Sequence, residues 1–225
     1  MAKGIELKTE RLNLRPMRLA DADAILAYSS DEVWAQYHDK LPDMDFIEEF
    51  VAHHVLALWA DDPRFSIVLD SEVIGGIGLT IDRKYAHGEL AYSLAREHWG
   101  KGLVVEAARE VVRWGFEELE LAKIWTRADA LNTQSTRVME ELGMTLEGML
   151  RAHTVVRGER RDEVRYGLLR DEWIEQASLG GDLPYTTDHL CPMTCDTVPP
   201  PSARLGQRKP DRGPNCERTT NSDRI

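Results

Sequence analysis

The first 177 residues contain no cysteine. All three cysteines, Cys191, Cys195 and Cys216, lie near the C-terminal end, so this part of the chain has neither a disulfide framework nor a cysteine nucleophile. Long hydrophobic runs are also missing. No segment reaches the roughly 20 apolar residues that span a bilayer, and the N-terminus lacks the apolar core of a signal peptide. We therefore expect a soluble, cytoplasmic protein with no membrane partner.

Positive charge is in the minority. The chain has 28 Lys and Arg residues against 39 Asp and Glu residues, for a formal net charge of −11. Such a surface repels phosphate backbones, which argues against a nucleic-acid partner. A cationic substrate such as a protonated amine is compatible with this charge, although acidity that serves only solubility explains it equally well.

Tryptophan and phenylalanine are absent from residues 178–225, which hold seven of the ten prolines. Such a segment buries too little apolar surface to offset its ordering entropy, so we predict a folded domain over 1–177 and a disordered tail over 178–225. His189 and the three cysteines could in principle supply four zinc ligands. Their spacing does not match paired Cys-x-x-Cys knuckles, and we predict no metal site.

One junction in the middle of the chain combines a strand pattern with a helix pattern. Leu90, Tyr92 and Leu94 alternate with more polar residues, as in a strand with one buried face. Beyond Gly100 and Gly102, apolar residues recur at three- and four-residue spacing, which indicates an amphipathic helix. The first turn of a helix has unpaired N–H groups and partial positive charge, and glycine lets an anion approach them. The junction therefore predicts a phosphate-binding loop.

Two common nucleotide-binding patterns do not fit this loop. The dinucleotide fingerprint requires a third glycine where Val105 stands, and no Gly-Lys-Ser/Thr P-loop occurs. An oxidoreductase that binds NAD at this loop is therefore disfavoured.

A second motif lies downstream, at residues 132–144: Asn-Thr-Gln-Ser-Thr-Arg-Val-Met-Glu-Glu-Leu-Gly-Met. Together with Trp-Gly-Lys-Gly at 99–102, it resembles the GNAT acyltransferase superfamily, and most closely its RimJ/RimL-like branch of ribosomal-protein N-terminal acetyltransferases. The resemblance covers most of residues 5–176. It implies an α/β (α+β type) fold with a mixed central sheet of about seven strands flanked by about four helices.

The periodicity places these elements along the chain. We expect a first helix capped by Asp21 or Asp23, a second from Pro42 to Trp59, and the hairpin turn of the last two strands at 157–160. Gly75-Gly76 suggests a bulge or a close approach of another segment in its strand. Strands are expected at 5–16 (bent or hairpin-like), 65–69, 73–81, 88–95, 123–128, 145–156 and 163–169, and two further helices after Gly102 and at 133–142.

The resemblance implies acetyl-CoA as co-substrate. Lys101 and Arg137 could reach its phosphates, and Asn132 could cap its own helix or bind the pantetheine amide. The pantetheine arm is expected to pair with the main chain of Leu94, Ala95 and Arg96. The pyrophosphate is expected on the backbone amides of Trp99, Gly100, Lys101, Gly102, Leu103 and Val104.

Transfer of the acetyl group to a primary amine needs a base, which we choose from the strand pattern, and a proton donor and an oxyanion donor, which the same resemblance suggests. Glu89 is the candidate base, acting directly or through water, with His87 as the second choice. Ser135 is the candidate proton donor to the leaving thiolate, and Tyr166 is the alternative. A backbone N–H near Leu94 would stabilise the oxyanion.

We expect the acceptor to be a protein N-terminal α-amine or a small amine, and the protein to be a monomer or homodimer. The alternative is a sensor module that binds acyl-CoA without transfer. Acidic residues near the acceptor site would suit a cationic amine: Asp31, Glu32, Asp43 and Asp45. Residues that could line the acceptor groove are Tyr28, Trp34, Tyr37, His38 and Arg157.

Overall fold

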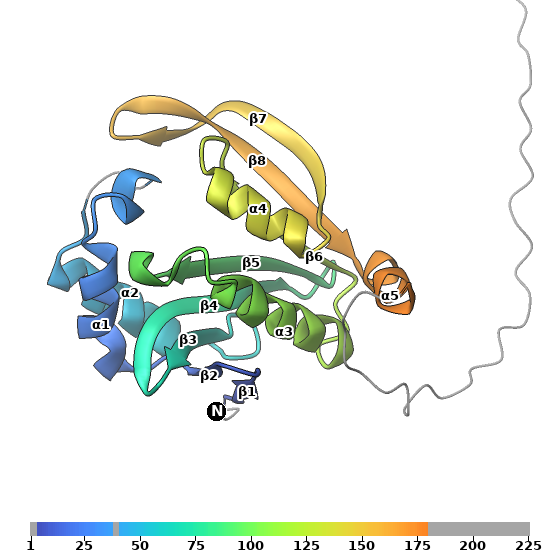
Figure 1. Ribbon diagram of the computed structural model, residues 1–225, viewed down its shortest axis with the longest axis horizontal. Coiled ribbons are helices and arrows are strands. Elements are labelled where there is room, and N and C mark those ends of the chain that lie inside the picture. The colour runs from blue at the N-terminus through green and yellow to red at the C-terminus, as the bar shows by residue number, and fades with distance from the viewer. Residues whose placement is uncertain (1–3, 38–40, 180–225) are drawn as a thin grey trace, which may run out of the picture. The chain divides into compact units, whose positions relative to one another are not determined.

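A computed structural model describes residues 4–37 and 41–179, which lie in one compact unit. Within them, eight strands form a single sheet in the order β1-β2-β3-β4-β5-β6-β8-β7 (Figure 1). All neighbouring strands are antiparallel except β5 and β6. The strands are β1 (Leu7–Lys8), β2 (Asn13–Pro16), β3 (Arg64–Leu69), β4 (Glu72–Asp82), β5 (His87–Leu94), β6 (Lys123–Asp129), β7 (Thr145–Val156) and β8 (Glu159–Leu169).

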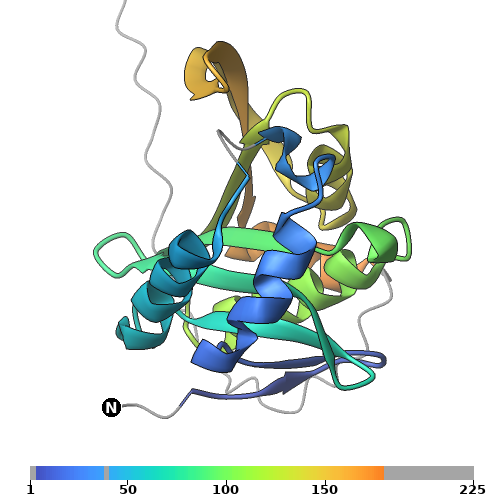
Figure 2. The ribbon, with the colours of Figure 1, turned by 90° about the vertical axis from the view of Figure 1, so that its left-hand side faces the viewer.

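Helices cover both faces of the sheet (Figure 2). On one face of β5, the Tyr28 hydroxyl of α1 lies 3.1 Å from that of Ser93. On the other face, Leu90 of the same strand packs into the core that α3 covers. The α-helices of the described residues are α1 (Ala22–Ser29), α2 (Met44–Leu56), α3 (Leu103–Glu117), α4 (Thr133–Glu141) and α5 (Arg170–Ser178), and the short 3-10 helices are η1 (Leu19–Asp21), η2 (Trp34–Tyr37) and η3 (Arg96–His98).

The main core lies between the sheet and α3. The ring of Phe65 on β3 meets Trp114 of α3 edge-on, with 5.6 Å between ring centroids. Phe65 and Phe116 are fully buried, and burying a side chain of this size stabilises the fold by about 2–3 kcal/mol. A smaller cluster around Ile25, Ile47 and Val51 joins α1 to α2. These cores fix α3, and with it the loop that precedes it, against the sheet.

The sheet opens between β5 and β6. Their parallel pairing covers only His87–Glu89 opposite Lys123–Trp125. Beyond this point β5 continues with β4 as far as Leu94, and β6 continues with β8 as far as Asp129. The two strands therefore diverge towards their C-terminal ends, where α3 and α4 begin (Figure 1).

Most of the expected elements are confirmed, including the bulge. Ile67 pairs with Gly75 and Val68 with Val73, so Ile74 is the extra residue in β4. The predicted turn at 157–160 is a two-residue loop in which Arg157 and Gly158 both have positive φ, as expected of a type I′ hairpin. The last strand therefore begins at Glu159, four residues earlier than predicted.

Three expectations about local structure are wrong. The Asp21 side chain does not cap α1. It is buried and accepts hydrogen bonds from Arg15 and Ser66, which hold its pKa below the usual value although burial alone would raise it. Helix α2 ends at Leu56, not Trp59. The fifth helix, α5, was not predicted at all.

The predicted boundary between domain and tail, at residues 177 and 178, lies next to the end of the described residues. Ser178 still belongs to α5, and residues 180–225, with His189 and the three cysteines, lie outside the described residues. Within the part of the chain that is described, no helix has the length and apolar character needed to cross a membrane.

Candidate functional site

The loop between β5 and α3 has the backbone of an anion-binding turn. Gly100 and Gly102 have φ values of +71° and +72°, a region that favours glycine. Gly102 is the N-cap of α3, so the unpaired N–H groups of the first helical turn follow it directly. A Cβ built on Gly100 would meet nothing within 4 Å. The loop therefore exposes main-chain donors to open space.

Trp99 fastens this loop to the end of β5. Its indole Nε1 donates to the Leu94 carbonyl at 2.8 Å. Its backbone N–H closes the turn of η3 by donating to the Arg96 carbonyl at 3.0 Å. The predicted role of Trp99 was main-chain contact with the cofactor, and the structure adds a side-chain bond that fixes the loop.

A cavity of about 570 Å³ lies between this loop, β5 and the start of α4. It brings together most of the predicted cofactor residues. Ala95, Arg96 and Lys101 are not among the lining residues. The cavity is lined by Tyr37, Tyr92, Ser93, Leu94, His98, Trp99, Gly100, Gly102, Leu103, Val104, Val105, Asn132, Gln134, Ser135, Arg137, Val138 and Glu141.

The main chain of β5 offers free groups at this cavity. Ala95 donates its N–H to the Ile74 carbonyl at 2.7 Å. Because hydrogen-bonding directions alternate along an antiparallel pair, the N–H groups of Leu94 and Tyr92 point away from β4. They face the opening where β6 has diverged. Among the described residues, the Leu94 N–H thus has no strand partner at the place expected of the oxyanion donor, whereas the Ala95 N–H bonds to Ile74.

The start of α4 forms the opposite wall. Asn132 is the N-cap, and its Oδ1 accepts the Ser135 N–H at 3.1 Å. Within residues 4–37 and 41–179, no protein group hydrogen-bonds to the Asn132 amide nitrogen or to the Ser135 hydroxyl. The capping role predicted for Asn132 is confirmed, and its amide N–H₂ group is left for a ligand.

Tyr92 connects the two walls. Its hydroxyl donates to the Ser135 carbonyl at 3.2 Å, so the end of β5 is tied to the first turn of α4. Burial raises the pKa of Tyr92 to about 12, although the bond to Ser135 acts in the opposite direction. The phenol therefore stays protonated at neutral pH and serves as a donor.

The two cations predicted near the phosphates differ in position. Arg137 lines the cavity and is exposed, and it forms no ion pair with any residue that the structure describes. Lys101 is exposed outside the lining, and its carbonyl accepts a hydrogen bond from Arg11. Arg137 is therefore the better placed of the two for a phosphate group.

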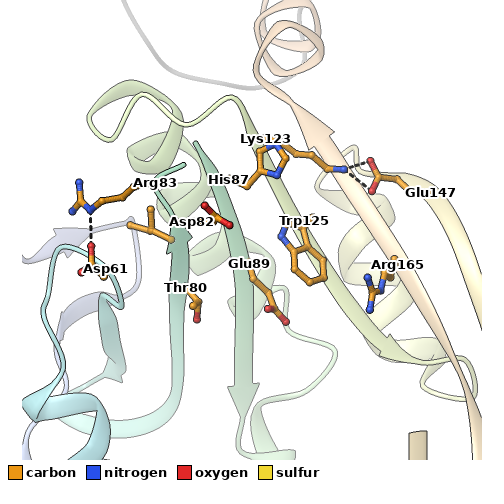
Figure 3. Close-up of a pocket in the computed structure, with 11 residues that line it drawn as sticks. Asp61, Thr80, Asp82, Arg83, His87, Glu89, Lys123, Trp125, Glu147 and Arg165 are labelled. Atoms are coloured by element: carbon orange, nitrogen blue, oxygen red, sulfur yellow. Dashed lines mark hydrogen bonds and ion pairs between the residues drawn. The ribbon is translucent and has the colours of Figure 1, made fainter. Parts of the chain in front are cut away.

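Glu89 and His87 lie elsewhere, in a shallower cavity of about 810 Å³ (Figure 3). Here the side chains of β4, β5 and β6 form the floor. The Arg127 guanidinium donates from Nε to Glu89 Oε1 at 2.9 Å and contacts buried Glu163 at 3.4 Å. Glu89 is five residues from Leu94, about 16 Å along the strand. The Glu89 carboxylate is therefore too far from an amine placed at the Leu94 N–H to take its proton directly.

Tyr166 and Tyr28 are not among the lining residues of either cavity. The hydroxyl of Tyr166 donates to Glu140 at 3.4 Å, and burial together with this carboxylate raises its pKa. Tyr28 is buried, with its hydroxyl 3.1 Å from that of Ser93. Ser93 itself lines the cofactor cavity, and the expectation that Tyr28 lines an acceptor groove stays a prediction.

The other predicted acceptor residues are scattered. Tyr37 lines the cofactor cavity, where its hydroxyl reaches the Leu131 carbonyl at 3.5 Å. Asp31 approaches Arg96 at 3.4 Å, and Asp43 caps α2. Glu32 and Asp45 are exposed, Arg157 is in the hairpin turn, Trp34 belongs to η2, and His38 is outside the described residues.

Comparison with known proteins agrees with this arrangement. Residues 11–145 match the model of the "Acetyltransferase (GNAT) domain" family. An N-acetyltransferase of Bacillus licheniformis named p20, described as uncharacterized, is 35% identical over 74% of this chain and 97% of its own length. The putative ribosomal N-acetyltransferase YdaF of Bacillus subtilis is 35% identical over 48% of this chain and 59% of its own length.

The fold is shared with solved structures. A GNAT-family acetyltransferase from Bacillus anthracis superposes with a TM-score of 0.68 at 27% identity, covering 75% of this chain and all of that one.

Proposed function

We propose an acceptor and a set of catalytic roles for this chain. The chain belongs to the GNAT family of N-acetyltransferases and is an enzyme that transfers acetyl groups from acetyl-CoA to amines. The acceptor that we propose is the N-terminal α-amine of a protein. In support, the relative YdaF carries the name of a putative ribosomal N-acetyltransferase.

Acetyl-CoA would occupy the cavity between β5 and α4. Its pyrophosphate would lie on the main-chain N–H groups at Gly100–Val104, with Arg137 at the rim. The pantetheine arm would run along β5, next to the N–H groups of Tyr92 and Leu94 that point away from β4. This pairing is displaced towards the N-terminus from the predicted Leu94–Arg96, because the Ala95 N–H and the Arg96 carbonyl already have partners.

The thioester would then lie between the Leu94 N–H and the Ser135 hydroxyl. Attack by the amine nitrogen forms the C–N bond and places negative charge on the thioester oxygen, which the Leu94 N–H stabilises. Collapse breaks the C–S bond. Ser135 donates its proton to the departing sulfur and accepts one of the two protons on the positively charged nitrogen, so that the hydroxyl is restored and the amide keeps one N–H.

The acceptor must first lose a proton, because an amine is almost wholly charged at neutral pH. We assign this step to Glu89. The separation of about 16 Å along the strand from Leu94 requires water molecules between carboxylate and amine. Arg127 donates hydrogen bonds to the carboxylates of both Glu89 and Glu163, and so holds Glu89 in place. Burial would lower the pKa of Arg127, but the two carboxylates raise it above its usual value.

One observation carries this proposal: Leu94, Asn132 and Ser135 line a single cavity together with the glycine loop. The test is incubation of the full chain with acetyl-CoA and a pool of N-terminal peptides, polyamines and amino acids, with mass spectrometry of the products. We expect acetylated peptide N-termini. An acetylated polyamine with unmodified peptides would overturn the acceptor and leave the family activity intact.

A further inference from the structure

A group of three side chains supports the phosphate loop from behind. Thr9 and Arg11 come from the turn between β1 and β2, and Glu106 lies in the first turn of α3. Glu106 Oε1 accepts from the Thr9 hydroxyl at 2.5 Å and from the Arg11 N–H at 2.9 Å. Glu106 Oε2 lies 2.6 Å from both Nε and NH2 of Arg11. The guanidinium thus makes a two-point contact with one carboxylate oxygen.

Arg11 makes one further contact, with the loop itself. Its NH1 donates to the carbonyl oxygen of Lys101 at 3.0 Å. The peptide unit that joins Lys101 to Gly102 is planar and trans, so its N–H points in the direction opposite to its carbonyl. By holding the carbonyl, Arg11 directs the Gly102 N–H away from itself. Gly102 lines the cofactor cavity, so this N–H is available to a phosphate oxygen.

The carboxylate of Glu106 poses an electrostatic problem for an anion site. Burial would raise its pKa, but the bonds from Thr9 and Arg11 lower it below the usual value, so Glu106 is ionised at neutral pH. A negative charge in the first turn of a helix stabilises the helix but competes with a bound phosphate for the same positive end. The Arg11 guanidinium offsets this charge.

We propose that Arg11 is a positioning residue for the pyrophosphate of acetyl-CoA: it orients the Lys101–Gly102 peptide and neutralises Glu106. This inference rests on the proposed placement of the pyrophosphate. It is tested by binding, without an acceptor, so a wrong acceptor cannot affect the result.

The first measurement is calorimetric titration of CoA into Arg11→Gln. We expect the Kd for CoA to rise about tenfold or more. The variant loses the charge-assisted hydrogen bond to the Lys101 carbonyl, and the negative charge of Glu106 is no longer offset. Arg113→Gln is the matched control. Arg113 pairs with Glu110 and Glu117 on the same helix and does not line the cavity, so its CoA affinity should stay within twofold of wild type.

Two further variants separate positioning from folding. Arg11→Lys keeps the charge but cannot hold both Glu106 and the Lys101 carbonyl, so its Kd should fall between those of wild type and Arg11→Gln. Arg11→Gln/Glu106→Gln removes the uncompensated charge and should recover part of the lost affinity.

Activity gives a readout that a structural role would not reproduce. With acetyl-pantetheine, which lacks the pyrophosphate, kcat/KM of Arg11→Gln should match wild type, while kcat/KM with acetyl-CoA falls. An equal loss with both donors would overturn the proposal. So would unchanged CoA affinity in Arg11→Gln and Arg11→Lys, or, if Arg11→Gln fails to fold, in Arg11→Lys alone.

Discussion

The phenol of Tyr92 donates a hydrogen bond to the backbone carbonyl of Ser135 at 3.2 Å. This bond crosses the opening between β5 and β6 and joins the strand that carries the proposed oxyanion donor to the helix that carries the proposed proton donor. We therefore propose that the spacing between these two walls of the cavity depends on a tyrosine that takes no part in proton transfer.

Tyr92→Phe should lower both stability and turnover. The Ser135 carbonyl loses the hydrogen bond from the phenol, which costs about 1 kcal/mol of unfolding free energy, and the first turn of α4 is less well held, which should reduce kcat several-fold. Denaturant unfolding and steady-state kinetics check these effects. Exposed Tyr85 provides the control, Tyr85→Phe. A stability loss with unchanged kcat would mean that Tyr92 only supports the fold.

Ser135→Ala should lower kcat by about tenfold or more while the Kd for acetyl-CoA stays within twofold. The hydroxyl has no described protein partner, so its loss breaks no internal contact. Ser178→Ala is the control, because that hydroxyl bonds the Ile174 carbonyl in α5, outside both cavities. Stopped-flow kinetics and CoA titration separate the two effects. Full activity in Ser135→Ala would remove the residue from the mechanism.

Glu89→Gln should reduce turnover most strongly at neutral pH and least at high pH, where more of the acceptor amine is already neutral. Glu147→Gln is a matched control, since Glu147 lines the same cavity and is also paired with a cation, Lys123. The pH profile of kcat/KM is the measurement. Identical profiles for wild type and Glu89→Gln would rule out Glu89 as the base.

Asp62 should govern part of the acid stability. Burial would raise its pKa, but His54 at 2.6 Å and Arg64 at 2.7 Å lower it from 3.8 to about 2. Since the folded pKa is the lower one, the stabilisation is present above about pH 4 and is lost as pH falls through about 2. It amounts to about 2 kcal/mol.

Asp62→Asn should therefore be less stable than wild type at pH 7, with the difference narrowing below pH 4. The neighbouring Asp61 pairs with Arg83 at the surface, so Asp61→Asn should cost less than about 1 kcal/mol at any pH. Urea unfolding at a series of pH values measures both. Equal losses for the two variants would contradict the special role of Asp62.

Signals local in sequence predicted much of this molecule. The alternation at Leu90, Tyr92 and Leu94 indicated β5, and the glycines at 100 and 102 indicated a turn that only positive φ values satisfy. Asn132 was identified as a cap because capping needs only the next three residues. In each case the physical cause lies within a few positions of the residue that reveals it.

Contacts between distant segments were not predictable in this way. Arg11 and Glu106 are 95 positions apart, and Arg127 meets Glu89 only because the β5–β6 register brings the strands together. Ala95 was expected to bind pantetheine, but its N–H is taken by Ile74 across the β4 bulge. Helix α5 was missed because its main anchor, the packing of Trp173 on Phe116, is likewise non-local.

The most direct test of this account is a crystal structure of the chain with CoA, in which the distance from the CoA sulfur to the Ser135 hydroxyl oxygen is measured. We predict that the sulfur lies in the cavity between β5 and α4, within about 4 Å of that oxygen and close to the Leu94 N–H. A sulfur on the Glu89 side of the sheet, or more than about 6 Å from Ser135, would contradict the proposed mechanism.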